Sequence, residues 1–358
     1  MNTLRVLIAG GGTGGHVIPA LAIARELRDA HGAEVRFVGT ARGLETRLVP
    51  EAGFRLELVR SGQLKNVSLR TRLRTAVDLP LGVVECVRLI GEFRPQVVVG
   101  VGGYASGPGM LAAVLLRVPT LAFEPNAVPG MTNRWLGRWV SAAALNFAQT
   151  VRYFRKARVT GIPVRAEFFA IAPKSGGGLR LLVFGGSQGA RVLNGAMPKV
   201  AGRLLERYPE LEIVHQAGGR HLETTAAAFE AAGVGERVRV QPYLDDMPAE
   251  FAAADLILCR SGASTVAELA AAGRPSLLVP FAAAADDHQR KNAEAMVEAG
   301  ASRMLTEGDF TAERLLEELV GMLGDRDGLR AMGERARAMA RPDAVKEIAG
   351  MVKTVAGC

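Results

Sequence analysis

Two glycine-rich segments in the first half of the chain contain residues that could do chemistry. Residues 10–16 read GGGTGGH and residues 102–109 read GGYASGPG, each after a buried apolar run. Glycines let the backbone approach a phosphate, and a helix start offers free N–H groups to it. His16 would stand at such a start, where the helix dipole favours the neutral ring as a proton acceptor. The alternative is a histidine that only caps the turn.

The first segment also matches a dinucleotide-binding pattern, because Gly10, Gly12 and Gly15 fit GxGxxG. That pattern requires an acidic residue at the end of the second strand, where this chain has Gly39 and Thr40. The GK[ST] of a P-loop is missing as well. The sequence therefore argues against an NAD-dependent dehydrogenase.

A third polar segment, FEPNAVPG at residues 123–130, follows the apolar run TLAFE. It places Glu124 and Asn126 at a strand end, and Glu124 is the second candidate for a catalytic base. Three polar, glycine-bearing loops at successive strand ends predict a ligand site, because ligands of open α/β sheets bind outside the carboxyl ends of the strands.

The second half offers a further set of candidates. The segment GGSQGA (185–190) brings Ser187 and backbone amides to a helix start, which suits a diphosphate. A small-residue turn within 259–273 leads into a helix carrying Glu268, whose carboxylate could accept bonds from ribose hydroxyls. Taken alone, Glu268 is more simply a surface residue on an alanine-rich helix. Gln289 and Asn292, in DDHQRKNA, are possible sugar contacts.

The acidic pair Asp325 and Asp327 forms a DxD, which many glycosyltransferases use to hold a metal. It lies between two helical patterns and away from the glycine loops, so we interpret it as a solvated turn and expect no catalytic metal. The three cysteines are widely spaced and fit reduced thiols in a cytoplasmic protein.

The fold prediction rests on alternation. Nine short apolar runs alternate with amphipathic stretches, which predicts parallel sheets covered by helices. A weak repeat relates residues 6–16 to 181–190, each a buried strand followed by a glycine turn and a helix. We therefore expect an α/β protein of two Rossmann-like domains, with parallel sheets facing across a cleft and a join near residues 160–163.

Charge is uneven along the chain. Residues 1–164 contain 21 Lys/Arg and 10 Asp/Glu, a net +11 that leaves −3 for the remainder. An anionic partner should therefore meet the N-terminal half. With no signal peptide and no apolar run long enough to cross a bilayer, we expect a soluble or peripheral protein.

Two segments could meet a membrane. Residues 69–90 combine early arginines (Arg70, Arg72 and Arg74) with later apolar residues, the pattern of a docking helix. Trp135 and Trp139 are flanked by arginines, which suits a headgroup layer, but aromatics at i and i+4 are more often a buried stripe of a helix. We favour the buried stripe for the tryptophans and the 69–90 helix for docking.

Together these motifs resemble one family, the MurG-type glycosyltransferases of bacterial cell-wall synthesis. The resemblance covers nearly the whole chain, and the ordered set is specific although each motif alone is weak. The only small departure is FEPN, where Pro125 stands in place of an expected Gln. The matching segments are, in order, GGTGGH, GGYASGPG, PNAVPG, TGIPVR, GGSQGA, YLDDM, RSGASTVAE and DDHQRKNA.

The resemblance implies a GT-B architecture. Residues 1–161 would form an acceptor-binding, membrane-facing domain, residues 162–341 a UDP-sugar domain, and helix 342–358 would pack back on the first. The acceptor would be undecaprenyl-diphospho-muramoyl-pentapeptide, with its diphosphate at the glycine loops, on an anionic membrane at the cytoplasmic face of the inner membrane. No cofactor, metal or nucleic acid partner is implied.

For the donor, the resemblance implies a UDP-N-acetylglucosamine site in the second domain. Leu244 would lie at the uracil and Glu268 at the ribose, with Ser187 near the diphosphate. The remaining donor-site residues implied are Thr13, Gly14, Gly15, Asn126, Arg165, Ala263, Ser264, Thr265, Val266, Ala267 and Gln289.

The implied reaction is a single displacement with inversion. The C4 hydroxyl of the muramoyl sugar would attack C1 of N-acetylglucosamine, with His16 or Glu124 taking the proton and UDP leaving. A UDP-N-acetylglucosamine 2-epimerase would share the donor-site features, but would not need the basic N-terminal half. A non-catalytic sugar-nucleotide-binding protein would have no use for His16.

Overall fold

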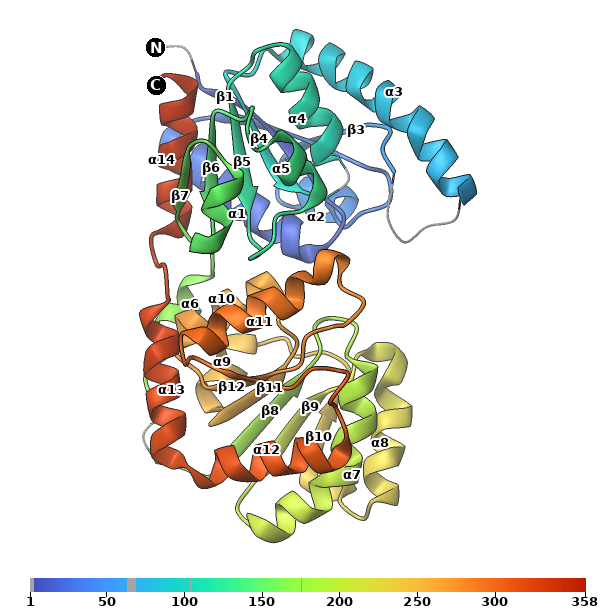
Figure 1. Cartoon of the computed structure of the whole chain (residues 1–358), viewed down its shortest axis with the longest axis vertical. Helices are drawn as coiled ribbons and strands as arrows, with labels where there is room; N and C mark the ends of the chain where they lie inside the picture. Colours follow the sequence, from blue (N-terminus) through green and yellow to red (C-terminus); the bar gives the residue numbers. More distant parts are fainter. Residues whose placement is uncertain (1–2, 63–68, 104, 175) are drawn as a thin grey trace. The chain divides into compact units, whose positions relative to one another are not determined.

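The apolar runs of the sequence form two parallel sheets in the computed structural model, which describes residues 3–62, 69–103, 105–174 and 176–358. The sheets belong to two separate units of the chain (Figure 1). Unit 1 comprises Met1–Pro163 and Asp343–Cys358, and unit 2 comprises Val164–Pro342.

Unit 1 is built on a seven-stranded sheet with the order β3-β2-β1-β4-β5-β6-β7. All neighbouring strands are parallel, so their carboxyl ends lie at one edge. The strands are β1 (Arg5–Gly10), β2 (Glu34–Gly39), β3 (Arg55–Leu58), β4 (Val97–Gly102), β5 (Thr120–Glu124), β6 (Ala142–Leu145) and β7 (Ala157–Val159).

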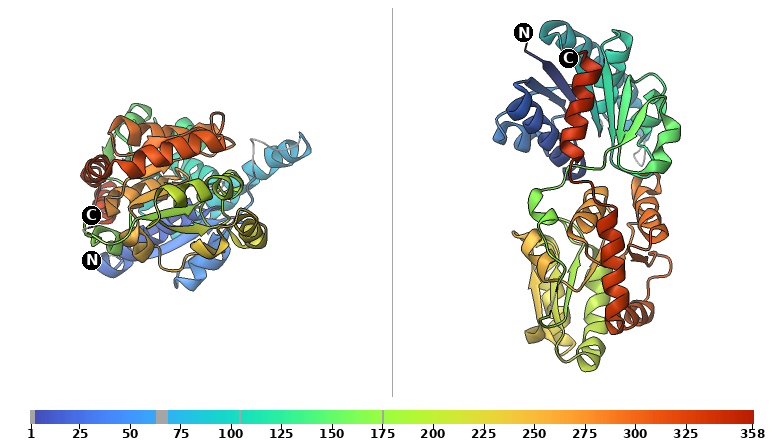
Figure 2. Two further views of the ribbon diagram at one scale, coloured as in Figure 1. Left: turned by 90° about the horizontal axis from the view of Figure 1, so that it is seen from below. Right: turned by 90° about the vertical axis from the view of Figure 1, so that its left-hand side faces the viewer.

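Helices cover both faces of the unit 1 sheet, as a parallel sheet requires. The helices α1 and α14 pack against each other on one face, and α3 packs on α4 over the other. Figure 2 shows α14, which ends at the C-terminus, along the first face. The helices are α1 (Gly14–His31), α2 (Glu45–Glu51), α3 (Leu69–Phe93), α4 (Ser106–Leu115), α5 (Met131–Leu136), the 3₁₀ helix η1 (Ala148–Tyr153) and α14 (Ala344–Ala356).

Unit 2 repeats this plan with a six-stranded parallel sheet of order β10-β9-β8-β11-β12-β13. Both sheets thus place a strand, a glycine turn and a helix at their centre, as Rossmann-type sheets do. The strands are β8 (Arg180–Phe184), β9 (Glu212–Gln216), β10 (Val238–Gln241), β11 (Leu256–Cys259), β12 (Ser276–Leu278) and β13 (Arg303–Met304).

The unit 2 helices also divide between the two faces. Helices α7, α8 and α12 pack their apolar sides against one face of the sheet. Helices α6, α9, α10 and α13 pack together on the other face. The unit 2 helices are α6 (Ala166–Phe169), α7 (Arg191–Arg207), η2 (Gly219–His221), α8 (Leu222–Ala231), η3 (Gly235–Arg237), α9 (Met247–Ala253), α10 (Ala263–Ala272), η4 (Ala285–Asp287), α11 (His288–Glu298), α12 (Ala312–Gly324) and α13 (Arg326–Ala338).

A buried histidine fixes the start of α7 in unit 2. His215 on β9 is fully buried, and its Nε2 lies 2.9 Å from Oδ1 of Asn194. Asn194 in turn donates to the Ala217 carbonyl. Burial lowers the pKa of His215 to about 4, so the ring is neutral and its bond to Asn194 has a structural role. The contact holds α7 and its preceding glycine loop against the strand ends.

The predicted fold class, two Rossmann-like domains with parallel sheets, is confirmed, and all nine predicted runs form strands. Among the described residues the structure adds β3, β6, β7 and β13. The strands AAAL and ARV are too poor in β-branched residues to stand out in the sequence, and β13 has only two residues. Within the described residues, no helix is both long and apolar enough to span a bilayer.

The interpretation of Trp135 and Trp139 as a buried helix stripe is wrong. Helix α5 ends at Leu136, so the two rings do not share a helix, and their side chains are 67% and 65% exposed. Other exposed apolar side chains occur on α3 and on α4, which packs against both α3 and α5 (Figure 1). We call the following set the apolar surface of unit 1: Val77, Leu81, Val84, Leu111, Leu115, Trp135 and Trp139.

The arginines that the sequence assigned to the docking helix precede this surface on α3. The side chains of Arg70, Arg72 and Arg74 lie outside the described residues. Their predicted role is therefore not tested by the structure.

Candidate functional site

The first glycine loop of unit 1 connects β1 to α1. Gly10 and Gly12 have φ values of +154° and +95°, which other residues adopt only with strain. Thr13 is the exposed N-cap, and its carbonyl accepts from the N–H groups of His16 and Val17. Its hydroxyl makes no capping bond. The N–H groups of the first turn, including those of Gly14 and Gly15, therefore point out of the helix start, where a polar ligand can accept them.

His16 lies between this loop and the second glycine loop. A Cβ on Gly102 would come within 2.7 Å of both Cε1 and Nδ1 of the His16 ring, so the ring rests on the bare Gly102 backbone. The Gly11 N–H also donates to the Gly102 carbonyl at 3.2 Å. The structure thus brings the two predicted loops together, with the His16 imidazole half-buried at the third position of α1.

Glu124 is held inside its own loop. Its Oε1 accepts from the backbone and side-chain amides of Asn126, and its Oε2 from Gly130 N–H and the Asn133 amide, at 2.9–3.3 Å. These four donors use the four lone-pair sites of a carboxylate. Burial raises the pKa of Glu124, and the bonds from Asn133, Asn126 and Gly130 oppose that rise. This arrangement orders the loop that carries Asn126 and uses the acceptor sites of the Glu124 carboxylate within that loop and α5.

The third glycine loop, in unit 2, connects β8 to α7. Gly186 and Gly189 have positive φ, and a Cβ on Gly189 would lie 1.9 Å from the Ala217 carbonyl oxygen. Ser187 is exposed in the turn between them. The Gly185 N–H donates to Oε1 of Gln216, a buried neutral side chain at the end of β9. The loop therefore exposes the Ser187 hydroxyl, and the side chain that supports the loop, Gln216, is uncharged.

The helix α10 brings together a second set of predicted residues. It begins at Ala263 after the N-cap Gly262, with no side-chain cap, so the amides of residues 263–265 are available at its start. Val266 is buried, whereas Ala263, Ser264, Thr265 and Ala267 are half-buried.

Glu268 lies one turn into α10, near Arg165. Burial raises the pKa of Glu268 to about 7, and the Arg165 guanidinium opposes part of that rise. Within the described residues, no hydrogen bond reaches the Glu268 carboxylate. Arg165 is exposed and stacks over Phe168, with its Cζ 5.0 Å from the ring centroid. A half-buried carboxylate with open acceptor sites is what a site for ligand hydroxyls requires.

Gln289 and Asn292 on α11 hold the loops around this helix. Phe281 N–H donates to Oε1 of Gln289, and the Ser261 hydroxyl donates to the Gln289 carbonyl. Asn292 is fully buried and donates to the Ser261 carbonyl, so the expectation that it contacts a sugar is wrong. Within the described residues, no hydrogen bond from the Gln289 amide nitrogen is present.

Leu244 lies between β10 and α9 with its side chain 3% exposed. A ligand could therefore reach Leu244 only through the backbone.

The DxD is part of a helix junction. Asp325 accepts from Gly328 N–H and caps α13, and Asp327 is an exposed residue of the same first turn. Among the described residues, no group of three or more metal-ligating side chains is present.

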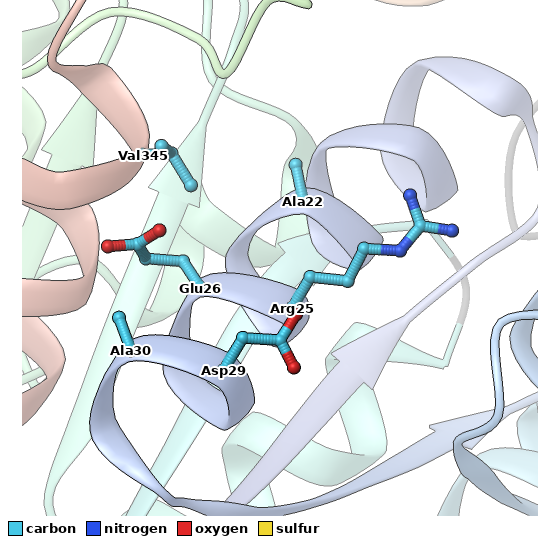
Figure 3. A pocket seen from close by; sticks show the side chains of 6 residues that line it. All are labelled: Ala22, Arg25, Glu26, Asp29, Ala30 and Val345. Carbon is cyan, nitrogen blue, oxygen red and sulfur yellow. The ribbon is translucent and has the colours of Figure 1, made fainter.

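A shallow depression of unit 1 lies elsewhere. Figure 3 shows it between the second half of α1 and the start of α14. Because α1 runs back from the glycine loop, the depression lies toward the opposite edge of the sheet. It contains no candidate residue, and its lining is Ala22, Arg25, Glu26, Asp29, Ala30 and Val345.

One buried carboxylate near the first loop was not singled out from the sequence. Glu45, the first residue of α2, is 1% exposed and accepts from Gly12 N–H at 2.6 Å. In the sequence, Glu45 is marked only by the nearby glycines Gly39 and Gly43. That these glycines and Gly11 all contact the Glu45 side chain is visible only in the folded structure.

Comparison with known proteins covers both units. Residues 6–145 match the glycosyltransferase family 28 N-terminal domain, and residues 180–348 match the glycosyltransferase family 28 C-terminal domain. A relative from Solibacter usitatus, a UDP-N-acetylglucosamine–N-acetylmuramyl-(pentapeptide) pyrophosphoryl-undecaprenol N-acetylglucosamine transferase, is 47% identical over 98% of this chain and 96% of its own.

Solved structures agree. MurG from Acinetobacter baumannii has a TM-score of 0.83 and 31% identity, covering 98% of this chain and 99% of that chain. A putative UDP-N-acetylglucosamine 2-epimerase from Listeria monocytogenes has a TM-score of 0.70 over 99% of this chain and 96% of its own, but only 15% identity. The likeness to the epimerase shows the fold alone.

The raised pKa of Glu268 generates a stability prediction. The folded carboxyl titrates near 7 and the unfolded one near 4.5, so the folded state binds its proton more tightly and stability falls as pH rises between these values. Glu268→Gln should therefore raise the free energy of unfolding by roughly 1 kcal/mol at pH 8 and by much less at pH 5.

The measurement is denaturant unfolding at both pH values, with Glu298→Gln at the exposed end of α11 as the control. Equal effects of Glu268→Gln at pH 5 and pH 8 would show that the folded carboxyl titrates in its ordinary range.

Proposed function

This chain belongs to glycosyltransferase family 28 and, within it, to the MurG-type transferases, and on that premise we propose how its residues carry out the reaction. The enzyme transfers N-acetylglucosamine from UDP-N-acetylglucosamine to the C4 hydroxyl of undecaprenyl-diphospho-N-acetylmuramoyl-pentapeptide, with inversion, in peptidoglycan synthesis. The observation that carries this function is identity of 41–47% to curated transferases over nearly the full chain.

Unit 2 takes the donor in this proposal. The half-buried Glu268 carboxylate accepts bonds from the ribose hydroxyls, and the amides at the start of α10 and the exposed Ser187 bind the diphosphate. Arg165 and Gln289 complete the contacts to the donor, with the Leu244 backbone at the uracil. From unit 1, Asn126 and the Thr13–Gly15 turn meet the donor sugar.

Unit 1 takes the acceptor and supplies the base. The C4 oxygen of the muramoyl sugar attacks C1 of N-acetylglucosamine, its proton passes to His16, and the bond from C1 to the UDP oxygen breaks. Helix-start amides stabilise the charge that develops on UDP. His16 is supported by its place on bare backbone between two glycine loops, and Glu124 is disfavoured because its own loop uses all its acceptor sites.

A transfer assay tests the function directly. Labelled N-acetylglucosamine should pass from the UDP sugar to a lipid-diphosphate muramoyl-peptide. Conversion to the 2-epimer without transfer would instead support the epimerase alternative.

Donor binding should depend on Glu268. Leaving ribose hydroxyls without their acceptor costs about 1 to 3 kcal/mol, so Glu268→Ala should weaken UDP binding at least several-fold. In the unchanged enzyme, affinity should rise with pH through about 7 as the carboxyl ionises, and the variant should lose this dependence. Calorimetry between pH 6 and 8 measures both, and unchanged affinity in the variant would remove Glu268 from the site.

The base assignment predicts a separation of turnover from donor binding. Because a positioned base contributes roughly 10² to 10⁴-fold, His16→Ala should lower kcat by about that factor while UDP affinity changes little. His31→Ala, at the exposed far end of α1, is the matched control. A capping role for His16 would instead lower the melting temperature, with activity falling only in proportion to folded protein.

We also propose that unit 1 binds the cytoplasmic face of the inner membrane through its apolar surface. Trp135 lies on α5 and Trp139 follows that helix, and α5 packs against α4, which with α3 carries the other exposed apolar side chains. All of them belong to the half of the chain that has the positive charge. Tryptophan suits the headgroup layer, and the basic residues suit anionic lipid.

Vesicle binding tests this surface. Burying one aromatic side chain contributes about 1.5 to 3 kcal/mol, so Trp135→Ser combined with Trp139→Ser should weaken co-sedimentation with anionic vesicles at least tenfold. Tyr243→Ser, an exposed aromatic of unit 2, is the control. If the double variant sediments like the unchanged protein, the membrane contact lies elsewhere on the chain.

A further inference from the structure

The Glu45 carboxylate is enclosed by the loops that follow β1 and β2. Its Oε2 accepts from Gly12 N–H at 2.6 Å, and its Oε1 accepts from the N–H and the hydroxyl of Thr40, both at 3.0 Å. All three partners are donors, as an ionised carboxylate requires. With 1% of its surface exposed, the group is out of reach of bulk water and of any substrate.

Three glycines make room for this carboxylate. A Cβ on Gly11, Gly39 or Gly43 would come within 2.3, 2.7 or 1.8 Å of Glu45 side-chain atoms. The backbone also closes around it, because Leu44 N–H donates to the Gly12 carbonyl at 3.0 Å. Gly11 comes from the loop after β1, and Gly39 and Gly43 come from the end of β2 and the segment after it, so two parts of the chain form a cradle for one anion beneath the first glycine loop.

The cradle coincides with the two places where a Rossmann fold usually contacts a nucleotide. In a dinucleotide site the glycine loop donates its N–H groups to the pyrophosphate, and an acid at the end of the second strand binds the ribose. Here Gly12 in the loop and Thr40 after the second strand both donate to Glu45 instead. A phosphate approaching the Gly12 amide would meet a buried negative charge and an amide already in use.

Unit 2 gives an internal comparison. Its glycine loop follows the equivalent strand β8, and the Gly185 N–H donates to Gln216 at the end of the equivalent second strand β9. The supporting group is therefore a neutral amide in the donor-binding unit and a carboxylate in the acceptor-binding unit. The two loops share a backbone plan but differ in the charge that supports them.

We propose that Glu45 is a positioning residue that serves as a built-in anion for the first glycine loop. The effect of Glu45 on catalysis rests on the proposed function. Glu45 holds Gly12 and Thr13, and through them the start of α1 that bears His16, in place without a bound phosphate. It also keeps phosphate groups away from the Gly12 amide, so the acceptor's diphosphate does not bind there.

The test removes the carboxylate and then returns one from solution. Glu45→Ala should lower kcat about 10- to 100-fold, because small displacements of a catalytic group cost about that much, while UDP affinity stays unchanged. Formate, the probe, should restore at least several-fold of the lost activity by occupying the vacated cradle. Glu51→Ala, at the exposed end of the same helix, should neither lose activity nor respond to formate.

Two further measurements make the result decisive. Combining Glu45→Ala with His16→Ala should cost little more than His16→Ala alone, because Glu45 acts through that side chain. Hydrogen exchange should show a protected Gly12 amide in the unchanged protein, lost protection in Glu45→Ala and restored protection with formate. This readout needs no transfer activity, so it stands even if the proposed function fails. Full activity in Glu45→Ala, or a loss that matches unfolding and does not respond to formate, would overturn the proposal.

Discussion

Contact between bare backbones in unit 1 is the constraint on which the site depends. A Cβ on Gly103 would lie 2.0 Å from the Gly11 carbonyl oxygen, and a Cβ on Gly10 would lie 2.4 Å from that of Gly102. Any larger residue would push the two loops apart. Only because they touch can the His16 ring rest on Gly102 with its position set by backbone atoms, which move less than side chains. The glycines are therefore required by packing between loops, whether or not they also approach a ligand.

The fold was largely predictable because its signals are local. A parallel sheet buried on both faces needs continuous apolar strands, and nine such runs were visible in the sequence. The strands that were not predicted are short. Of these, β6 reads AAAL and β7 reads ARV, so neither forms an apolar run rich in β-branched residues. Such strands form because neighbours already set their register, which is tertiary information that no local pattern carries. The prediction for Trp135 and Trp139 failed for a different reason. A spacing of four residues puts two side chains on one face only if both lie in the same helix, and α5 ends at Leu136, before Trp139.

The sequence named candidate site residues, but it could not show the surroundings that distinguish them. The motifs located His16, Glu124 and Glu268, yet the three have quite different surroundings. Glu124 accepts from four donors of its own loop and α5, whereas within the described residues no hydrogen bond to the Glu268 carboxylate is present. Burial raises the pKa of both carboxyls. Glu45 could not be found at all, because its partners come from the loop before α1 and from the end of β2. Hydrogen-bond partners distant in sequence decide which carboxylate is structural.

The glycine loops of the two units share a backbone plan but differ in the charge of the side chain beside them. A glycine loop before a helix presents N–H groups whatever its sequence, so a neighbouring group must determine whether those amides receive a substrate anion or an internal one. In unit 2 the neighbour is the neutral Gln216, and the loop remains suited to the donor diphosphate. In unit 1 the neighbour is Glu45, which accepts from the Gly12 N–H, and in our proposal the exposed turn at Thr13 is left for neutral hydroxyls. We propose that this difference disfavours any phosphate at the Gly12 amide of unit 1, because Glu45 already holds that amide with a carboxylate, whereas the unit 2 loop has no such charge beside it.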